Sequence, residues 1–298
     1  MTLHVSSGGL VSSSTLRVRI LSLQQSQTLS CCMVVNVVDH FNPQFPPGVA
    51  FLKLFDRRFA EELRTSNAMD PWTERAEDLY IESVQSGRAR LFLDLLQSEN
   101  GFKETEHEWT EADMESFVAN ELRELYDTEV ATYNALEPYQ GNLIPRLLAT
   151  VNLDITPTHF HSPQPTDDHF LVKGLLLQYI PGFTLQNLAK FAPRGAWQNI
   201  VDQALNAVHM LHNNNILNKD VRLPNFMVSP LVNGGYQVYM IDFGLCILRR
   251  ADHSDREWGQ LKVYFDEEGC VGLKMGKKLA EKGFALQYQN SGKYLQWA

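Results

Sequence analysis

Two oppositely charged side chains stand in apolar surroundings and could neutralise each other. Lys53 lies within residues 49–55, a run that is apolar on both faces if it forms a strand. Glu129 interrupts an apolar stripe with helical spacing, made of Leu122, Leu125, Tyr126, Tyr133 and Leu136. Taken singly, Lys53 fits an edge strand whose lysine head reaches water, and Glu129 fits a rim position or a hydrogen bond to a tyrosine. Because a buried charge needs a partner, we expect Lys53 and Glu129 to pair.

Three oxygen-bearing side chains farther along the chain could hold a divalent ion. Asp220 and Asn225 stand five positions apart in a loop after an apolar helix, and Asp242 ends an apolar strand directly before Phe243 and Gly244. Aspartate and asparagine in a loop often bond only their own backbone, which is the structural alternative. Carboxylate and amide oxygens are also the ligands that suit Mg²⁺. The pattern therefore predicts either an ordinary turn or a magnesium site.

The order of these residues resembles the protein-kinase-like superfamily. A strand lysine, a helix glutamate, an Asp-x4-Asn loop and an Asp-Phe-Gly turn are the parts with which protein kinases transfer a phosphoryl group. The phrases FLKLFDRRF at 51–59 and QGNLIPRLL at 140–148 resemble kinase-like proteins common in fungi. The resemblance runs from Phe51 to Gly244, about two thirds of the chain.

The resemblance implies a catalytic role for four side chains. Lys53 would hold the α- and β-phosphates of ATP and be positioned by Glu129. Asp220 would orient and deprotonate the acceptor hydroxyl, and Arg222 would neutralise the transferring phosphoryl group. Cationic groups are needed there because ATP brings about four negative charges to the reaction.

The resemblance also implies how the cofactors ATP and Mg²⁺ would be bound. Asn225 and Asp242 would hold Mg²⁺ through their side-chain oxygens. The backbone of the hinge residues Gln178, Tyr179 and Ile180 would meet adenine. The partners implied are a nucleotide and a hydroxyl substrate, with a protein serine or threonine slightly favoured over a small molecule.

The fold class that follows is α+β, a bilobal protein-kinase-like fold. We expect a flexible tail over 1–15, an N-lobe with a small β-sheet over 16–180, and a truncated, mostly helical C-lobe over 181–298. The N-lobe would carry a helical insertion over about 57–115 and an αC-like helix over about 111–137. The C-lobe would contain the catalytic-type loop and the Asp-Phe-Gly turn.

Alternating apolar runs predict the strands of the first lobe. Three runs, at 16–23, 29–38 and 49–55, are typical of a meander. Two more, at 146–155 and 170–180, flank a loop rich in proline, aspartate and histidine and predict a hairpin.

Capping signals predict the helices between those strands. Asp70-Pro71 favours a helix start, and Gly87 favours its end. Thr110, with Asp113 three residues on, resembles a capping box for a helix that Pro138 must end.

The second lobe is predicted to combine a helix with a hairpin. Residues 197–212 carry an apolar stripe at helical spacing, made of Ile200, Ala204, Val208 and Leu211. Residues 225–228 and 237–241 are joined through Asn233-Gly234-Gly235, which indicates a hairpin.

Three departures from the kinase pattern keep other functions open. Residues 21–29, LSLQQSQTL, contain no glycine where kinases cradle phosphate, and Asn218 stands where they usually have histidine. No proline follows Pro230, so an Ala-Pro-Glu element is absent. The alternatives are therefore a pseudokinase scaffold that binds nucleotide without catalysis, and a kinase of small molecules.

Composition excludes some classes of partner. The net charge of −9 gives no overall positive field, so we expect neither a nucleic-acid nor a membrane partner. No run approaches the roughly 18 apolar residues of a membrane span, and the first residues do not resemble a secretory signal. The cysteines Cys31, Cys32, Cys246 and Cys270 lack metal-type spacing and indicate reduced thiols in a cytoplasmic or nuclear protein.

Two polar clusters are interpreted as surface. The histidine-rich loop with His159, His161, Asp167, Asp168 and His169 fits no closed four-ligand metal site. The acidic run Glu104, Glu106, Glu108, Glu111, Asp113 and Glu115 is typical of a solvated face at a helix start.

Overall fold

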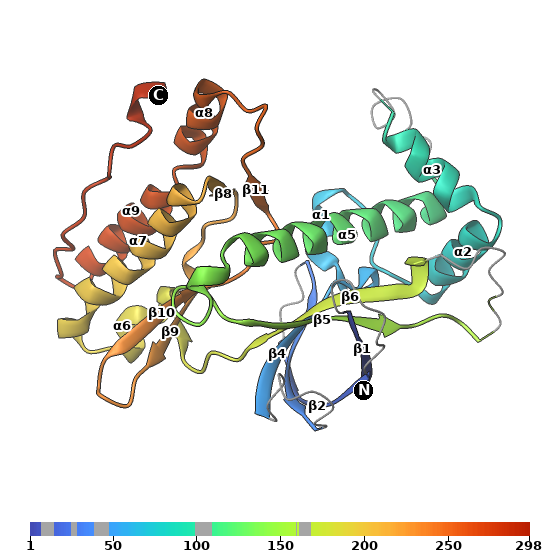
Figure 1. Ribbon diagram of the computed structural model, residues 1–298, viewed down its shortest axis with the longest axis horizontal. Coiled ribbons are helices and arrows are strands. Elements are labelled where there is room, and N and C mark those ends of the chain that lie inside the picture. Colours follow the sequence, from blue (N-terminus) through green and yellow to red (C-terminus); the bar gives the residue numbers. More distant parts are fainter. Residues whose placement is uncertain (7–14, 25–28, 39–47, 99–108, 159, 161–167) are drawn as a thin grey trace. The chain divides into compact units, whose positions relative to one another are not determined.

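The computed structural model describes residues 1–6, 15–24, 29–38, 48–98, 109–158, 160 and 168–298 (Figure 1). The chain forms two compact units. Unit 1 contains Met1–Tyr126 and Leu147–Leu177, and unit 2 contains Asp127–Arg146 and Gln178–Ala298. Unit 2 thus takes in a segment of the first half of the chain, Asp127–Arg146, in which Tyr133 packs edge-on against Phe243.

Unit 1 is built on a closed antiparallel barrel with the strand order β1-β2-β3-β4-β6-β5 (Figure 1). Its strands are β1 Thr2–Ser6, β2 Thr15–Leu23, β3 Cys31–Val37, β4 Gly48–Leu54, β5 Leu147–Asp154 and β6 Leu171–Gln178. The predicted meander is confirmed as β2, β3 and β4, and the predicted hairpin as β5 with β6. Inward-facing Leu3, Val35, Leu52 and Val151 are fully buried and form the centre of the barrel core.

The flexible tail predicted over 1–15 is wrong for residues 2–6. These residues form β1, in which Leu3 lies opposite Leu16 of β2 and Val5 lies opposite Val151 of β5. The strand closes the barrel, because it pairs with β2 on one side and with β5 on the other. Neither β2 nor β5 is then left with an unpaired edge. Residues 7–14 of the predicted tail lie outside the described residues.

Helices fill the insertion after β4. They are η1 Arg57–Phe59, α1 Glu61–Ser66, α2 Glu74–Gln85 and α3 Arg88–Leu96, followed by α5 Glu111–Ala135 and η3 Glu137–Tyr139. The start predicted at Asp70-Pro71 is wrong, because Thr73 caps α2 by accepting from the Ala76 backbone N–H. The end predicted at Gly87 and the Thr110–Asp113 capping pair are confirmed.

A buried ion-pair network joins the inserted helices to α5. Glu115 accepts hydrogen bonds from Arg57 at 2.7 Å and from Arg64 at 2.7 and 2.8 Å, and Arg57 also donates to Glu77 at 2.7 Å. Glu115 is 2% exposed. The solvated acidic face predicted here is therefore wrong for Glu115, and also for Asp113, which is buried and bonded to Arg88. Residues 104, 106 and 108 of that run lie outside the described residues.

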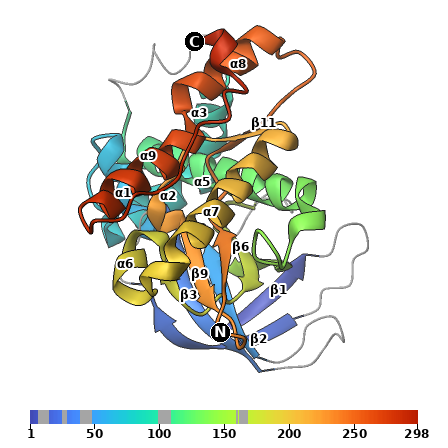
Figure 2. The same cartoon turned by 90° about the vertical axis from the view of Figure 1, so that its left-hand side faces the viewer.

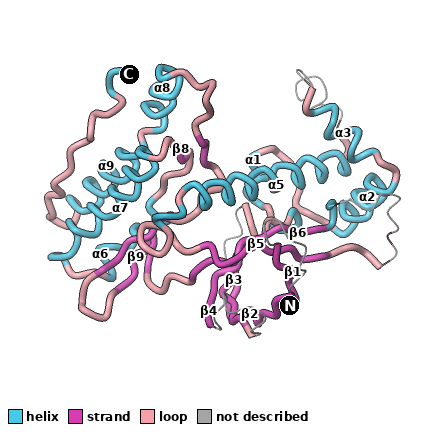
Figure 3. Tube along the Cα trace, in the orientation of Figure 1, coloured by secondary structure: helices cyan, strands magenta, loops and turns pink. Residues whose placement is uncertain are grey.

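Unit 2 holds small sheets among helices, drawn in magenta and cyan (Figure 3). The three-stranded sheet has the order β10-β9-β7, made of β10 Tyr236–Met240, β9 Phe226–Pro230 and β7 Phe183–Thr184, and β8 Ile216–Asn218 pairs with β11 Cys246–Leu248. The longer helices are α7 Trp197–Asn213, α8 Asp255–Phe265 and α9 Glu267–Ala280. Shorter turns are η4 Asp168–Phe170 in unit 1, and η5 Leu185–Asn187, α6 Leu188–Phe191, η6 Arg194–Ala196, η7 Leu223–Asn225 and η8 Leu295–Trp297 in unit 2.

Helix α7 forms the centre of unit 2. It packs against α9 and β10 (Figure 2). The helix and hairpin predicted in this part of the chain are confirmed, and the predicted stripe of Ile200, Ala204, Val208 and Leu211 is fully buried.

Two further features concern the helices and the cysteines. None of the helices in the described ranges combines the length and apolar character that crossing a bilayer requires. All four cysteines are free thiols.

The buried network predicts a large difference between two glutamates of α5. Glu115→Ala should lower the free energy of unfolding by about 3–5 kcal/mol, because it leaves the Arg64 guanidinium buried without its carboxylate. The matched change Glu111→Ala removes only an exposed 3.5 Å pair with Arg75 and should cost about 0–1 kcal/mol. Urea unfolding followed by circular dichroism measures both, and equal costs would contradict the network's role.

Candidate active site

The loop between β8 and β9 brings Asp220 and Asn225 together. The Asn225 side-chain nitrogen donates to the Asp220 backbone oxygen at 2.9 Å and to its carboxylate at 3.0 Å. Asn225 closes the turn η7, whose Pro224 occupies a first-turn position that does not need an N–H. Both bonds use the amide nitrogen, which leaves the amide oxygen as the possible metal ligand.

Asn218 connects this loop to Asp242. Its side-chain oxygen accepts from the Asp220 backbone N–H at 2.8 Å, and its side-chain nitrogen donates to the Asp242 backbone oxygen at 3.3 Å. Asp242 has a φ of 68°, a left-handed conformation that is uncommon for a residue with a side chain. Strained residues of this kind cluster at functional sites. Asn218 is thus a positioning residue, which its sequence position alone did not indicate.

The electrostatics of Asp220 favour a cation at this site. Burial raises the pKa of the Asp220 carboxyl, the nearby Arg222 guanidinium and the Asn225 amide lower it, and the Asp242 carboxylate raises it. Two carboxylates that repel each other are stabilised by a shared cation. Within the described residues, no group of three or more histidine, cysteine, aspartate or glutamate side chains could hold a metal by itself. An ion here would therefore rely on Asp242, the Asn225 amide and oxygens that do not come from such a cluster.

Arg222 lies against the candidate base. Its guanidinium is 2.8 Å from the Asp220 carboxylate, and the Arg222 side chain is about half exposed. The arginine is therefore held next to Asp220, and the predicted contact with a phosphoryl group requires it to turn away from that carboxylate.

A buried charged cluster is hydrogen-bonded to β8, the strand directly before this loop. This cluster was not predicted from the sequence. Glu267 accepts from the Asn218 backbone N–H at 2.8 Å, from Lys262 at 2.5 Å and from His212 at 3.0 Å. Lys262 also donates to the Ile216 backbone oxygen at 2.5 Å. Burial lowers the pKa of Lys262 and of His212, and the Glu267 carboxylate opposes that shift for each. The cluster therefore fixes both ends of β8, directly before Asp220.

The hinge residues belong to the same unit as the loop. The Gln178 backbone N–H donates to the Arg146 oxygen at 2.9 Å, whereas Tyr179 is exposed and Ile180 is buried. Farther on, β7 pairs with β9, and Gly182 approaches the Val228 backbone oxygen so closely that a Cβ would collide with it. This close approach ties the chain after the hinge to the strand that follows Asn225.

Lys53 and Glu129 are both buried but lie in different units. Lys53 is 6% exposed on β4, which has neighbours on both sides, so the edge-strand alternative is wrong. Its ammonium lies 5.2 Å from the centre of the Phe55 ring. Glu129 is completely buried on α5, so the rim alternative is wrong. The pairing of Lys53 with Glu129 stays a prediction.

Comparison with known proteins adds no assignment. No protein-family model matches the chain, and no curated protein is similar to it in sequence. The function must therefore be inferred from the residues of the loop and from the contacts that position them.

The buried cluster predicts strong coupling between Lys262 and Glu267. Glu267→Leu alone should lower the free energy of unfolding by about 3–5 kcal/mol, because it leaves the Lys262 ammonium uncompensated in the interior. Adding Lys262→Met should restore more than half of that loss, since an apolar pair needs no ionic partner. Urea unfolding of both single variants and the double variant measures the coupling. Additive losses would show that the two charges are independent.

Proposed function

We propose that the chain is an ATP- and Mg²⁺-dependent phosphotransferase of protein-kinase-like fold, which transfers the γ-phosphoryl group to a hydroxyl. A protein serine or threonine is the favoured acceptor, and a small molecule is the other. The observation that carries the proposal is the joining of Asp220, Asn225 and Asp242 through the two hydrogen bonds of Asn218 and those of Asn225. The buried lysine in the middle of the barrel sheet supports it.

Asp220 acts as the base in the proposed reaction. The acceptor oxygen attacks the γ-phosphorus, the bond from that phosphorus to the bridging oxygen breaks, and ADP leaves with the electron pair. The acceptor proton passes to the Asp220 carboxylate, whose raised pKa makes it a stronger base than an exposed aspartate. Arg222 lies beside that carboxylate, and by turning away from it the guanidinium would meet the charge on the migrating group.

The metal and nucleotide are assigned to the remaining residues. Asn225 and Asp242 provide the amide and carboxylate oxygens that suit Mg²⁺, which would neutralise charge on the phosphates when bound. Lys53 holds the α- and β-phosphates, positioned by Glu129. The backbone of Gln178, Tyr179 and Ile180 meets adenine.

One contact favours a second function, a nucleotide-binding scaffold without catalysis. The 2.8 Å pair between Arg222 and Asp220 holds the carboxylate that would have to accept a proton. The sequence at 21–29 points the same way, because it contains no glycine where kinases cradle phosphate. ATP with Mg²⁺ would then raise the melting temperature without being turned over.

Removal of the base tests the proposed catalysis. Asp220→Asn should lower Mg²⁺-dependent ATP turnover by at least about a hundredfold, the lower range for loss of a positioned base. Asp252→Asn, which changes an exposed aspartate of the same unit, should leave turnover unchanged. Release of ADP and autophosphorylation are measured on the full chain. A wild-type protein that is stabilised by ATP with Mg²⁺ yet shows no turnover would favour the scaffold instead.

The environment of Asp220 predicts the direction of a pH shift. Asp220 must be ionised to accept a proton, so kcat/KM should fall with decreasing pH at a value above the usual aspartate pKa of about 3.9. Arg222→Gln removes a group that lowers this pKa, so the acidic limb should move to still higher pH. A limb that stays in place or moves to lower pH in Arg222→Gln would contradict the assignment of Asp220 as the base.

A further inference from the structure

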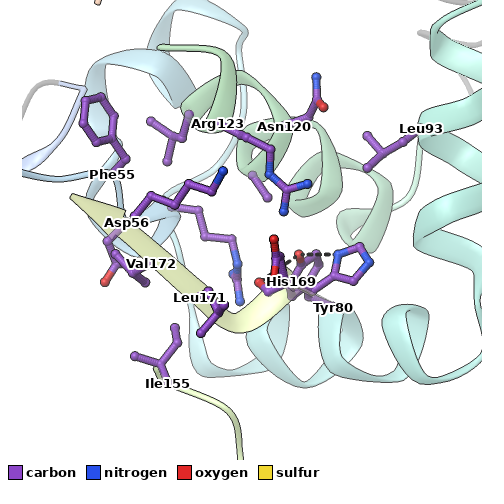
Figure 4. A pocket seen from close by; sticks show the side chains of 15 residues that line it. Phe55, Asp56, Tyr80, Leu93, Asn120, Arg123, Ile155, His169, Leu171 and Val172 are labelled. Atoms are coloured by element: carbon purple, nitrogen blue, oxygen red, sulfur yellow. Dashed lines mark hydrogen bonds between the residues drawn. The ribbon is translucent and has the colours of Figure 1, made fainter. Parts of the chain in front are cut away.

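The C-terminal segment of the chain covers the buried charged cluster around Glu267. After α9 the chain turns back, and residues 284–297, which we call the strap, run as a loop along unit 2 to η8, which packs against α8 (Figure 3). In unit 1, by contrast, Arg57 of the buried ion-pair network borders a cavity of about 60 Å³, whose wall Figure 4 shows at Tyr80 and His169. The charged cluster of unit 2 therefore has a segment of chain packed over it.

Two side chains near the start of α7 hold the beginning of the strap. The Gln198 side chain donates to the Gln287 backbone oxygen at 2.9 Å and accepts from the Gln287 N–H at 2.9 Å. Arg194 of η6 donates to the backbone oxygens of Lys282 and Gly283, directly before the strap. Because these bonds go to backbone groups, they fix the path of the chain itself.

Two glycines allow the strap to approach the helices closely. A Cβ at Gly272 of α9 would collide with the Tyr288 ring, and a Cβ at Gly259 of α8 would collide with the Trp297 ring. Glycine lowers the stability of a helix relative to alanine. Its presence inside both helices therefore fits a fixed contact with the strap.

Three strap residues contact the cluster itself. Ser291 donates to the Glu268 carboxylate twice, from its N–H at 2.8 Å and from its hydroxyl at 2.5 Å. The Lys293 ammonium donates to the His212 backbone oxygen at 3.3 Å, at the end of α7 where carbonyls lack partners within the helix. The Tyr294 ring packs edge-on against the His212 ring, with 5.4 Å between the centroids. The strap thus holds the end of α7 and the start of α9.

The Glu268 carboxylate depends on the strap for its hydrogen bonds. Glu268 is buried, and among the described residues only Ser291 donates hydrogen bonds to its carboxylate. The nearest ring nitrogens of His209 and His212 lie 3.5 and 3.6 Å away, beyond good hydrogen-bond distance. Burial raises the pKa of Glu268, but the hydrogen bonds from Ser291 lower it, and the net shift is downward. Without Ser291 the carboxylate would be buried and poorly compensated.

Glu268 leads from the strap to the candidate active site. It directly follows Glu267 in the first turn of α9. Glu267 accepts from the Asn218 backbone N–H at 2.8 Å, and the Asn218 side chain bonds the backbones of Asp220 and Asp242. Since two hydrogen bonds fix Glu268, they also restrain the neighbouring Glu267 and the start of the loop that it holds.

We propose that the strap is a positioning element of the candidate active site, in which Ser291 acts through Glu268 on the loop that carries Asp220. The catalytic part of this role rests on the proposed function. Ser291 has no assigned contact with nucleotide, metal or acceptor, so it is a positioning residue.

Amide exchange of Asn218 tests the positioning role without relying on activity. In the full chain, Ser291→Ala should speed hydrogen exchange of the Asn218 N–H about tenfold relative to that of Val208 in the centre of α7, the size expected for loss of a hydrogen bond to a charged group. Ser291→Thr keeps the hydroxyl and should exchange like the wild type. Gln289→Ala, which changes an exposed side chain of the strap, should do the same. NMR spectroscopy measures both amides.

ATP turnover separates this role from the proposed function. Mg²⁺-dependent turnover should fall about tenfold in Ser291→Ala and recover in Ser291→Thr. Faster Asn218 exchange in Ser291→Ala, with no turnover in the wild type, would support the positioning of the loop and overturn the proposed function alone. Unchanged Asn218 exchange in Ser291→Ala would overturn the positioning role, and so would faster exchange with undiminished turnover.

Discussion

The candidate active site depends on one buried carboxylate, that of Glu267. Lys262 and His212 stabilise this carboxylate in the interior by donating hydrogen bonds to it. The carboxylate also accepts a hydrogen bond from the backbone N–H of Asn218. The Asn218 side chain then fixes Asp220 on one side and Asp242 on the other. Because a charge buried in this way tolerates few alternative arrangements, it defines the loop more sharply than apolar packing alone would.

The same device appears in unit 1, where Glu115 gathers Arg57 and Arg64. There the ion pairs fasten inserted helices to α5 instead of shaping a loop. Buried ion pairs contribute little net stability compared with apolar side chains of similar size, but breaking one is costly. In both units the buried ion pairs therefore fix the position of specific segments, the inserted helices in unit 1 and the loop after β8 in unit 2. The apolar side chains of the neighbouring core provide most of the burial.

Local sequence patterns were sufficient to predict most helices and strands, and to identify site residues that are close together in the chain. Residue spacing and turn signals predicted the meander, the two hairpins and α7. The sequence also assigned Asp220 and Asn225 to one loop, where the structure joins them by a hydrogen bond. The burial of Lys53 and Glu129 also followed from their apolar surroundings.

Features that depend on distant partners could not be predicted. Strand β1 is defined by its pairing with β2 and β5. Asp113 and Glu115 belong to an acidic run that is typical of a solvated face, and only their distant arginine partners show that they are buried. Glu267 lies 49 positions from Asn218 and 55 from His212, and no local pattern links them. The exact start of a helix could also not be predicted, since Thr73 caps α2 and Asp70-Pro71 does not.

The most direct test of the central claim is calorimetric titration of ATP, with Mg²⁺ and with EDTA, into the wild type and Asp242→Asn. If the loop gathers its oxygens to hold a metal with the nucleotide, ATP should bind the wild type at least about tenfold more tightly with Mg²⁺, and Asp242→Asn should remove that difference. An ATP affinity that is the same in both proteins and indifferent to Mg²⁺ would contradict the account.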